Sequence, residues 1–465
     1  MDMEHLSVGV VGTGYVGLAT GACLAYIGHG VTCLDTDQGR VAGLREGRVP
    51  FYEPGLEELI AKSAGRLYFE GSEKLGEVVG EVDVLFVAVG TPQGGDGSAD
   101  LSNVADVAHA IGRALGGSPP RELPLVVVNK STVPVGSAYY VYSLISDGID
   151  SAGGEGAEFR VASNPEFLRE GSAVHDSLFP DRVVVGTDTW EALAALRTLY
   201  TPIVEQSFPT EWDPRPKVAV PFVTTDLASA EMIKYASNAF LATKISFINE
   251  VANLCELVGA DISEVAYGIG LDNRVGSRFL SAGLGWGGSC FPKDVAALRA
   301  TARDYEYETP LLDAAITVNE RQRRRVIHKL QRELHSLKGR RVALLGLSFK
   351  PNTDDMRGAP SLAIAGALTS LGARVVGYDP VAGKAAANLA PDIQVLFDPY
   401  EALRGAHAGV VVTEWEELRG LDPKRAASLM RDPKLIVDGR NALDAAASQQ
   451  AGLLYRGFGR GYDSG

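Results

Sequence analysis

Short runs of consecutive apolar residues recur along the first part of the chain, separated by longer segments in which apolar and polar positions mix. These runs lie at 7–11, 31–35, 84–89, 125–128 and 182–186. Continuous apolar runs of this length are typical of strands that are buried on both faces of a parallel sheet. The segment 18–27 is rich in Ala and Leu and predicts a helix. We expect 182–186 to be an edge strand.

The same pattern returns near the end of the chain, with strands predicted within 341–350, 374–380, 410–413 and 435–440. Between the two parts lie a proline-rich segment at 208–221, which predicts a linker, and helical patterns at 226–258 and up to about 338. The predicted fold class is α/β, with two Rossmann-like doubly wound domains joined by a long central helix and a helical dimerisation region. The expected domains are 1–208, 209–335 and 336–465. The tail from residue 457 onward is expected to be disordered.

A glycine-rich turn follows the first predicted strand and opens the first predicted helix. Its sequence from 12 to 17 is Gly-Thr-Gly-Tyr-Val-Gly. In this context Gly12 permits a tight turn, Gly14 lets the backbone approach a pyrophosphate, and Gly17 allows the helix to pack closely on the strand. The order strand, glycine turn, helix, strand predicts dinucleotide binding by the first domain.

The second strand ends on Asp35, 23 positions after Gly12 (35 − 12). This is close to the spacing of about 20 residues expected for an acid that binds the ribose. A carboxylate there would repel a 2′-phosphate, which favours NAD over NADP. Arg40 is the exception, because a nearby Arg can accommodate that phosphate; we expect it to lie along the adenosine side or to be solvated.

Hydroxyl side chains follow the next two strands. Thr91 and Pro92 come after 84–89, and Ser131 and Thr132 come after 125–128. Ligands of open α/β sheets bind at the carboxyl ends of strands, so Thr91, Ser131 and Thr132 are candidates to line the nicotinamide side. The alternative is that the hydroxyls cap helix N-termini.

Charged residues gather in two later segments. Glu166, Arg169 and Glu170 lie within five residues after a strand that ends at a proline, which fits either a site or a capped helix start with solvated acids. On the long helix, Glu231, Lys234 and Asn238 are spaced by three and four, which places them on one face. That face is either an exposed polar stripe or a site in which Lys and Asn meet an oxyanion.

The segment 283–294 reads Gly-Leu-Gly-Trp-Gly-Gly-Ser-Cys-Phe-Pro-Lys-Asp. So many glycines do not stabilise a helix or strand, and they suit a loop whose backbone approaches something closely. Cys290 lies at the end of this loop, just before Lys293 and Asp294, where a cation and backbone amides favour a reactive thiolate. The alternative is a tight turn with a buried structural Cys.

Composition limits the function classes. The chain has 465 residues, 46% hydrophobic and 22% charged, as is ordinary for globular domains, and no apolar run is long enough to span a bilayer. A net charge of −14 argues against nucleic acid or an anionic membrane as the main partner. Four cysteines, at 23, 33, 255 and 290, make neither a disulfide framework nor a metal signature. We expect reduced thiols, a cytoplasmic location and no metal.

From about residue 6 to 443 the chain resembles the UDP-glucose/GDP-mannose dehydrogenase family. The resemblance lies in seven ordered motifs, at 12–17, 50–56, 131–136, 164–171, 234–238, 287–294 and 438–440. It departs from the family pattern at 208–221, which is longer than typical, and at Trp286, where Phe or Tyr is common. The loop around Cys290 is closest to the UDP-glucose branch of the family.

The resemblance implies an NAD-dependent, four-electron oxidation of UDP-glucose to UDP-glucuronate through thiohemiacetal and thioester intermediates on Cys290. It assigns Asp294 to proton transfer with a water beside Lys234, Glu166 to the base for hydrolysis, Lys234 and Asn238 to the oxyanion, and Thr132 to the position of the water. The implied alternatives are oxidation of GDP-mannose or of a UDP-N-acetylhexosamine.

The resemblance also implies the remaining contacts. Those to NAD are Val11, Gly12, Gly14, Tyr15, Val16, Gly17, Asp35, Arg40, Thr91, Pro92, Ser131, Thr132, Glu170, Lys293 and Arg357. Those to the sugar nucleotide are Glu166, Phe167, Leu168, Arg169, Glu170, Lys234, Asn238, Phe279, Leu280, Ser281, Ala282, Gly283, Gly287, Phe291, Phe349, Lys350 and Arg440. Arg274 resembles an Arg that reaches the substrate of a neighbouring subunit, so we expect a homodimer or a larger homo-oligomer.

Two other classes stay open at this point. A catalytically silent nucleotide-sugar-binding regulator on the same scaffold would have no need of Cys290, Lys234 and Asn238, and all three are present. A two-electron alcohol dehydrogenase would need no Cys in the loop. The second α/β half has no glycine fingerprint, which disfavours a second dinucleotide and favours a different nucleotide or a sugar nucleotide, with Lys350, Arg357 and Arg440 as anion contacts.

Overall fold

The computed structural model describes residues 5–154, 157–211 and 219–460. The central part of the predicted linker, 212–218, lies outside these residues, as does the last part of the predicted tail, 461–465. The chain divides into two compact units. The first contains residues 1–237 and 296–305, and the second contains 238–295 and 306–465.

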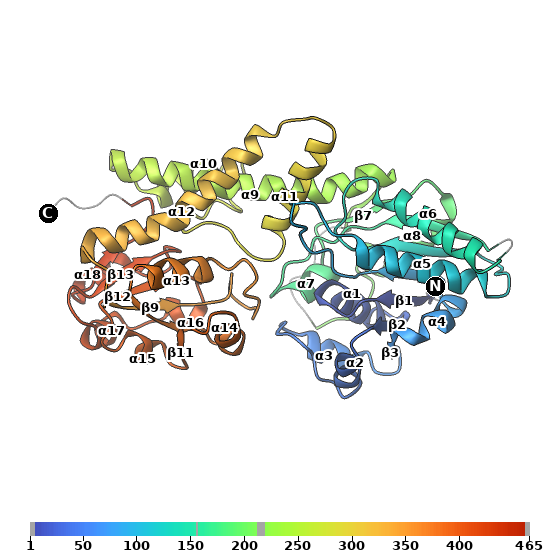
Figure 1. The fold of residues 1–465 in the computed structure, drawn as a ribbon, viewed down its shortest axis with the longest axis horizontal. Helices are drawn as coiled ribbons and strands as arrows, with labels where there is room; N and C mark the ends of the chain where they lie inside the picture. Colours follow the sequence, from blue (N-terminus) through green and yellow to red (C-terminus); the bar gives the residue numbers. More distant parts are fainter. Residues whose placement is uncertain (1–4, 155–156, 212–218, 461–465) are drawn as a thin grey trace. The chain divides into compact units, whose positions relative to one another are not determined.

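In the described part of the first unit, the strands form one eight-stranded sheet with the order β3-β2-β1-β4-β5-β6-β7-β8 (Figure 1). Its strands are β1 (Ser7–Val11), β2 (Gly30–Asp35), β3 (Leu67–Gly71), β4 (Val84–Val87), β5 (Leu125–Asn129), β6 (Phe159–Ser163), β7 (Val183–Gly186) and β8 (Phe222–Thr225). The helices of this part are α1 (Tyr15–Tyr26), α2 (Gln38–Arg45), α3 (Leu56–Lys62), α4 (Leu75–Glu81), α5 (Ser102–Gly116), α6 (Ser137–Ser151), α7 (Ala173–Leu178) and α8 (Trp190–Glu205).

The apolar runs form central strands because each strand is covered on both faces. Val126 and Val128 of β5 pack in one cluster with α1 and α8, whereas Leu125 and Val127 pack in another with α5 and α6. Alternate side chains of a strand point to opposite faces, so a run that is apolar at every position fits this arrangement. The strands predicted from the sequence are therefore confirmed.

One strand assignment was wrong. The strand predicted at 182–186 as an edge is β7, which lies between β6 and β8. It meets β6 in antiparallel orientation through a single pair, Ser163 and Gly186, and pairs with β8 in parallel. The edge strand is β8, whose side chains are half-buried or exposed.

The second sheet, in the described part of the second unit, has six parallel strands in the order β11-β10-β9-β12-β13-β14. Counted from its own first strand, this is the order 3-2-1-4-5-6, which the first six strands of the other sheet also follow. The strands are β9 (Arg341–Leu345), β10 (Arg374–Tyr378), β11 (Gln394–Leu396), β12 (Ala408–Val411), β13 (Leu435–Asp438) and β14 (Leu454–Arg456). The helices between them are α13 (Pro360–Ser370), α14 (Gly383–Leu389), α15 (Pro399–Leu403), α16 (Glu416–Arg419), α17 (Pro423–Leu429) and α18 (Ala445–Gln450).

The turn after the first strand is built alike in both sheets. Gly12 follows β1 with a φ of 100° and donates its N–H to Leu34 O at 2.8 Å. Gly346 follows β9 with a φ of 86° and donates its N–H to Tyr378 O at 2.7 Å. A positive φ favours glycine, so this one glycine of the fingerprint has a counterpart in the second half.

Four longer or central helices complete the fold: α9 (Leu227–Val258), α10 (Ile262–Gly270), α11 (Phe291–Asp304) and α12 (Pro310–Leu334). The 32 residues of α9 begin in the first unit and end in the second. Together with the two sheets, these helices confirm the predicted α/β class with its long central helix. Within the described ranges, no helix combines the length and apolarity needed to cross a membrane.

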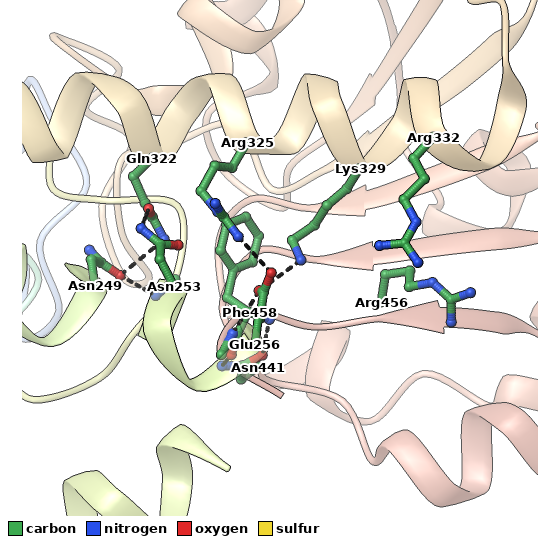
Figure 2. A network of polar contacts seen from close by, with 12 residues as sticks. Asn249, Asn253, Glu256, Gln322, Arg325, Lys329, Arg332, Asn441, Arg456 and Phe458 are labelled. Atoms are coloured by element: carbon green, nitrogen blue, oxygen red, sulfur yellow. Dashed lines mark hydrogen bonds and ion pairs between the residues drawn. The ribbon is translucent and has the colours of Figure 1, made fainter. Parts of the chain in front are cut away.

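The chain from 457 to 460 was expected to be disordered, and this prediction was wrong. Phe458 is fully buried, and the side chain of Asn441 bonds both its N–H (2.9 Å) and its carbonyl (2.8 Å). The Gly459 N–H donates to the Glu256 carboxylate at 2.9 Å, and Figure 2 shows this carboxylate beside Arg325 and Lys329. Glu256 also pairs with Arg325 at 2.6 Å and with Lys329 at 2.8 Å, so this segment is held by α9 and α12.

We predict that Glu256→Ala lowers the free energy of unfolding by about 3 kcal/mol, because it removes a buried carboxylate that pairs with the buried Lys329 charge at 2.8 Å. Urea denaturation of the purified protein measures this. Glu401→Ala is the matched control, since its carboxylate pairs with Arg404 at the surface and its loss should cost much less. Equal losses in the two variants would contradict the prediction.

Candidate active site

The predicted dinucleotide turn has the features that a bound pyrophosphate requires. A side chain at Gly17 would meet Gly12 O at 1.9 Å, so the helix packs directly on the turn, whereas the position above Gly14 is open. The N-terminus of α1 has no side-chain cap and no acidic residue in its first turn. Its N–H groups and the positive end of its dipole therefore fit a phosphate.

Asp35 closes β2 beside this turn, as predicted. Its Oδ2 accepts hydrogen bonds from the Thr13 N–H (2.8 Å) and hydroxyl (2.5 Å), and its Oδ1 accepts from the Asp37 N–H. Burial raises the pKa of Asp35, but these hydrogen bonds and the charge of Arg40 outweigh burial, so the pKa lies below its ordinary value. Arg40 forms an ion pair with Asp35 at 3.2 Å, which accounts for its position in this structure.

A second motif fastens this turn to a later segment. The Phe51 ring stacks on Tyr15 with centroids 4.7 Å apart, and the Tyr15 hydroxyl accepts the Gly171 N–H at 2.7 Å. Glu53, which is buried, accepts from the N–H groups of Gly171 and Ala173. No role was predicted for Glu53, although an acid within a mostly apolar motif is a signal that its carboxylate binds backbone N–H groups.

The hydroxyls at the ends of β4 and β5 do not cap helices, because α5 and α6 begin at Ser102 and Ser137. The capping alternative was wrong. Thr91 donates to Thr132 O at 2.8 Å, and Ser131 donates to Val89 O at 2.7 Å. The two loops are thus tied together at the carboxyl ends of adjacent strands.

The N-terminus of α6 is capped from another helix. Glu231 of α9 accepts the N–H groups of Gly136 (2.6 Å) and Ala138 (2.8 Å). Burial raises the pKa of Glu231 to about 7, and the backbone N–H groups only partly offset this effect. Of the three residues predicted to share a face of α9, Glu231 therefore supports the loop that carries Thr132.

Glu166 and Lys234 form a buried ion pair in the first unit. Their Oε1 and Nζ atoms are 2.7 Å apart, and both side chains are 5% exposed. Burial raises the pKa of Glu166, but the charge and hydrogen bond of Lys234, the Leu168 N–H and the charge of Lys130 outweigh it and lower the pKa below its ordinary value. The solvated-acid alternative is excluded for Glu166, and the exposed-stripe alternative is excluded for Lys234.

Asn238 and the cysteine loop form a second cluster, in the second unit. The Asn238 amide donates to Asp294 Oδ2 at 2.6 Å, and Lys293 pairs with Asp294 Oδ1 at 2.6 Å. Asp294 is buried, and its N–H donates to the carbonyl of Cys290, which is half-buried at the start of α11. The structure thus brings together the predicted amide, carboxylate, ammonium and thiol.

The glycines of this loop approach protein rather than open space. A side chain at Gly283 would meet Gly439 O at 2.3 Å, and one at Gly287 would meet Gly358 O at 2.4 Å. One at Gly285 would meet Asn319 at 2.3 Å. Sequence reasoning therefore found a close approach but not its partner, which is the backbone of the second α/β half.

Buried amides hold the same loop. Asn249 of α9 accepts the Gly283 N–H at 2.8 Å, and Asn319 of α12 bonds both the N–H and the carbonyl of Trp286. Trp286 also donates its indole N–H to Ser246. Neither Asn was predicted, and a polar residue within an amphipathic helix gives no signal that separates it from the exposed face.

The predicted arginine contacts all have partners in this structure. Arg169, Arg274 and Arg357 pair with the acids Asp176, Asp272 and Asp355, at distances of 2.6 to 2.8 Å, and their side chains are more than half exposed. Arg440 is more enclosed. It donates to the carbonyls of Val412, Gly285 and Phe349, so it supports the cysteine loop from β13.

The remaining predicted substrate contacts divide by burial. The side chains of Leu280 and Ala282 are buried in a cluster with α9. The rings of Phe279 and Phe291 lie 6.4 Å apart, and Phe167 lies beneath the Lys234 ammonium at 5.6 Å. The Lys350 ammonium lies 5.1 Å from the Phe349 ring.

The glycine turn, Asp35 and the strand order of the first sheet place the chain in the class of proteins with a Rossmann dinucleotide-binding domain. Three family models match the chain: the NAD binding domain at 6–204, the central domain at 228–321 and the UDP binding domain at 343–445 of the UDP-glucose/GDP-mannose dehydrogenase family. The chain belongs to this family, and its cofactor is NAD.

Comparison with individual proteins agrees with this assignment. The chain is 45% identical to a UDP-glucose 6-dehydrogenase of Bacillus subtilis over 98% of both chains. It is similar to the structure of a UDP-glucose dehydrogenase from Pyrobaculum islandicum, with a TM-score of 0.86 and 38% identity over 98% of both chains. A UDP-D-ManNAc dehydrogenase from Pyrococcus horikoshii matches with a TM-score of 0.81 and 25% identity, over 98% of this chain and 100% of that one.

We predict that stability falls between pH 5 and pH 7 through Glu231. Its folded-state pKa is raised, so its contribution is present below the unfolded pKa of about 4.5 and is lost as the pH rises toward 7. Glu231→Gln should remove about 2 kcal/mol of this decline, measured by urea denaturation at several pH values. Glu57→Gln, at an exposed position of α3, is the control and should leave the slope unchanged. A Glu231→Gln slope equal to that of the wild type would refute the prediction.

Proposed function

We propose that the protein oxidises the C6 alcohol of UDP-glucose to the carboxylate of UDP-glucuronate, using two NAD and one water. The observation that carries this proposal is the buried pairing of Asn238 with Asp294, next to a half-buried Cys290, in a chain of this family. The choice of glucose as the sugar rests on sequence identity, which is 45% to a UDP-glucose 6-dehydrogenase and 25% to a UDP-D-ManNAc dehydrogenase.

The first oxidation converts the alcohol to an aldehyde. NAD, held by the glycine turn and Asp35, supplies the hydride acceptor. Asp294, with a water beside Lys234, receives the proton of the hydroxyl, and Lys234 stabilises the developing oxyanion. A carboxylate that is buried and held by Lys293 and Asn238 has a fixed position from which to accept that proton.

The second oxidation proceeds on the protein. The Cys290 thiolate forms a bond to the aldehyde carbon, and the resulting thiohemiacetal oxyanion is stabilised by Lys234 and Asn238. These two residues are one turn apart on α9. Loss of a second hydride from the same carbon leaves a thioester on Cys290.

Hydrolysis completes the reaction. Glu166 accepts a proton from a water positioned by Thr132, the water oxygen adds to the thioester carbon, and the carbon–sulfur bond breaks to release the Cys290 thiolate and the carboxylate product. Burial raises the pKa of Glu166, but Lys234, the Leu168 N–H and Lys130 outweigh burial, so the carboxylate is ionised at neutral pH and is able to accept this proton.

The other predicted contacts complete the proposal. The first expected domain, 1–208, would carry NAD; 209–335 the cysteine loop and the subunit interface; and 336–465 the UDP group, with Phe349, Lys350 and Arg440 as contacts. Arg274 would reach the substrate of a neighbouring subunit, and its exposed side chain leaves it accessible for that role.

We infer a homo-oligomer, with α9 in the interface. Phe240, Phe247 and Leu254 recur every seven residues on α9 and are 54% to 66% exposed, and Leu257 is 83% exposed. An apolar stripe of this length along one helix is typical of a surface that another subunit covers. A cytoplasmic location fits a reaction that needs Cys290 as a reduced thiol.

We predict that two NADH form per UDP-glucose consumed, because two hydrides leave the same carbon. Absorbance at the NADH band with limiting UDP-glucose measures the ratio. Parallel assays use GDP-mannose and UDP-N-acetylglucosamine at equal concentration, and UDP-glucose should give the highest kcat/KM. A ratio of one would exclude the four-electron reaction, and a higher kcat/KM for another sugar would change the assigned substrate.

Cys290→Ser should lower steady-state turnover by at least about a thousandfold, because an un-ionised hydroxyl is a much weaker nucleophile and leaving group than a thiolate. Binding of NAD and UDP-glucose, measured by calorimetry, should persist. Cys255→Ala is the control: it removes a buried thiol from α9 and should retain turnover. Wild-type turnover in Cys290→Ser would rule out the nucleophile.

A further inference from the structure

Lys130 is a buried cation to which the proposed reaction gives no role. It follows β5, next to Ser131, and is only 8% exposed. Its ammonium donates to Asn164 Oδ1 at 2.8 Å and lies 3.5 Å from the Tyr200 hydroxyl. Across the described ranges, no carboxylate lies within ion-pair distance of it. A lysine buried against neutral groups costs free energy, so it calls for an electrostatic reason.

The position of this ammonium is fixed by its neighbours. The Asn164 amide donates through Nδ2 to Val184 O at 2.7 Å, so its Oδ1 must face Lys130 and Tyr200. Tyr200 donates to the same Oδ1 at 2.6 Å, and the Asn164 N–H donates to Asn129 O at 3.0 Å. Elements β5, β7, α8 and the end of β6 thus hold Lys130 in one place.

Two residues after Asn164 lies Glu166, which interacts with both Lys130 and Lys234. Burial, Lys234 and the Leu168 N–H have larger effects on the pKa of Glu166, and the charge of Lys130 lowers it further. In return, burial lowers the pKa of Lys130 to about 8, with Glu166 raising it and Lys234 lowering it further. A further charged group, the Arg182 guanidinium, stacks on the ring of Phe167, the residue after Glu166, at 3.8 Å. The buried cluster therefore holds two ammonium groups and one carboxylate.

The two lysines differ in what they can do. The Lys234 ammonium donates directly to Glu166, and in the proposed reaction it also stabilises the oxyanion of the substrate. A buried carboxylate left without a counter-charge would take up a proton and stop acting as a base. We propose that Lys130 is a positioning residue that supplies a second counter-charge, keeping Glu166 ionised while Lys234 contacts the substrate. This inference rests on the proposed hydrolytic role of Glu166.

The test separates the charge of Lys130 from its hydrogen bond. Lys130→Gln keeps a donor for Asn164 and removes the charge, Lys130→Arg keeps the charge, and Lys130→Met removes both. The measurement is kcat for UDP-glucose oxidation from pH 5 to 9. In Lys130→Gln and Lys130→Met the acid limb of the plot of kcat against pH should shift to higher pH, because Glu166 takes up a proton more readily. At pH 6 kcat should be roughly tenfold below the wild type, with KM unchanged. Lys130→Arg should keep the wild-type limb.

A burst measurement separates this inference from the proposed function. Mixing Lys130→Gln with excess substrate should give a rapid burst of two NADH per site before a slower steady state, because only hydrolysis is impaired. Lys329→Met is the control, since it neutralises a buried lysine beside a carboxylate in the other unit and should leave the acid limb unchanged.

An acid limb in Lys130→Gln that coincides with the wild type overturns the inference, as does an equal shift in Lys130→Arg. If the neutral variants do not fold, Lys130→Arg alone decides, because a shifted limb with the charge retained would exclude an electrostatic role. Failure of the proposed function looks different: the wild type itself would form no product or only one NADH per substrate.

Discussion

The buried ion pair between Glu166 and Lys234 is the interaction on which the first unit's part of the site depends. An isolated charge at 5% exposure is costly, so each residue requires the other, and the pair fixes the segment after β6 against the first turns of α9. Glu231, one turn earlier on α9, fixes the loop before α6 by accepting the N–H groups of Gly136 and Ala138. The loops at the carboxyl ends of β5 and β6 are thus positioned by a single helix, α9.

The fold was accessible from the sequence because a doubly wound sheet has a simple pattern. Strands buried on both faces are apolar at every position, and the glycine turn after β1 marks where the phosphate binds. The strand at 182–186 was correctly located but misplaced in the sheet. Its pairing partner, β8, is a short strand with exposed side chains that follows the prolines, and nothing in its pattern distinguishes it from a linker.

The candidate site was predictable where a residue's chemistry is unusual for its surroundings. Cys290, Lys234 and Asp294 stand out because a thiol, an ammonium and a carboxylate gain little from burial unless they pair or react. The amides that hold the surrounding loops were missed. Asn249, Asn319 and Asn164 each satisfy buried backbone or side-chain groups, and whether an amide faces the interior depends on tertiary packing that a single sequence does not display.

The two α/β halves use the same turn with different outcomes at the acid that ends the second strand. In the second half, Asp379 accepts from the N–H groups of Leu347 and Ser348 through Oδ2 and from those of Val381 and Ala382 through Oδ1. The Trp415 indole adds a further donor. Both oxygens of the Asp379 carboxylate thus accept hydrogen bonds from within the second half, which leaves no lone pair for a ribose hydroxyl. Glycines at the other fingerprint positions would therefore not create a second ribose site there, because the acceptor capacity of Asp379 is taken up within its own half, whereas Asp35 Oδ1 accepts a single N–H, that of Asp37, from the described part of the chain.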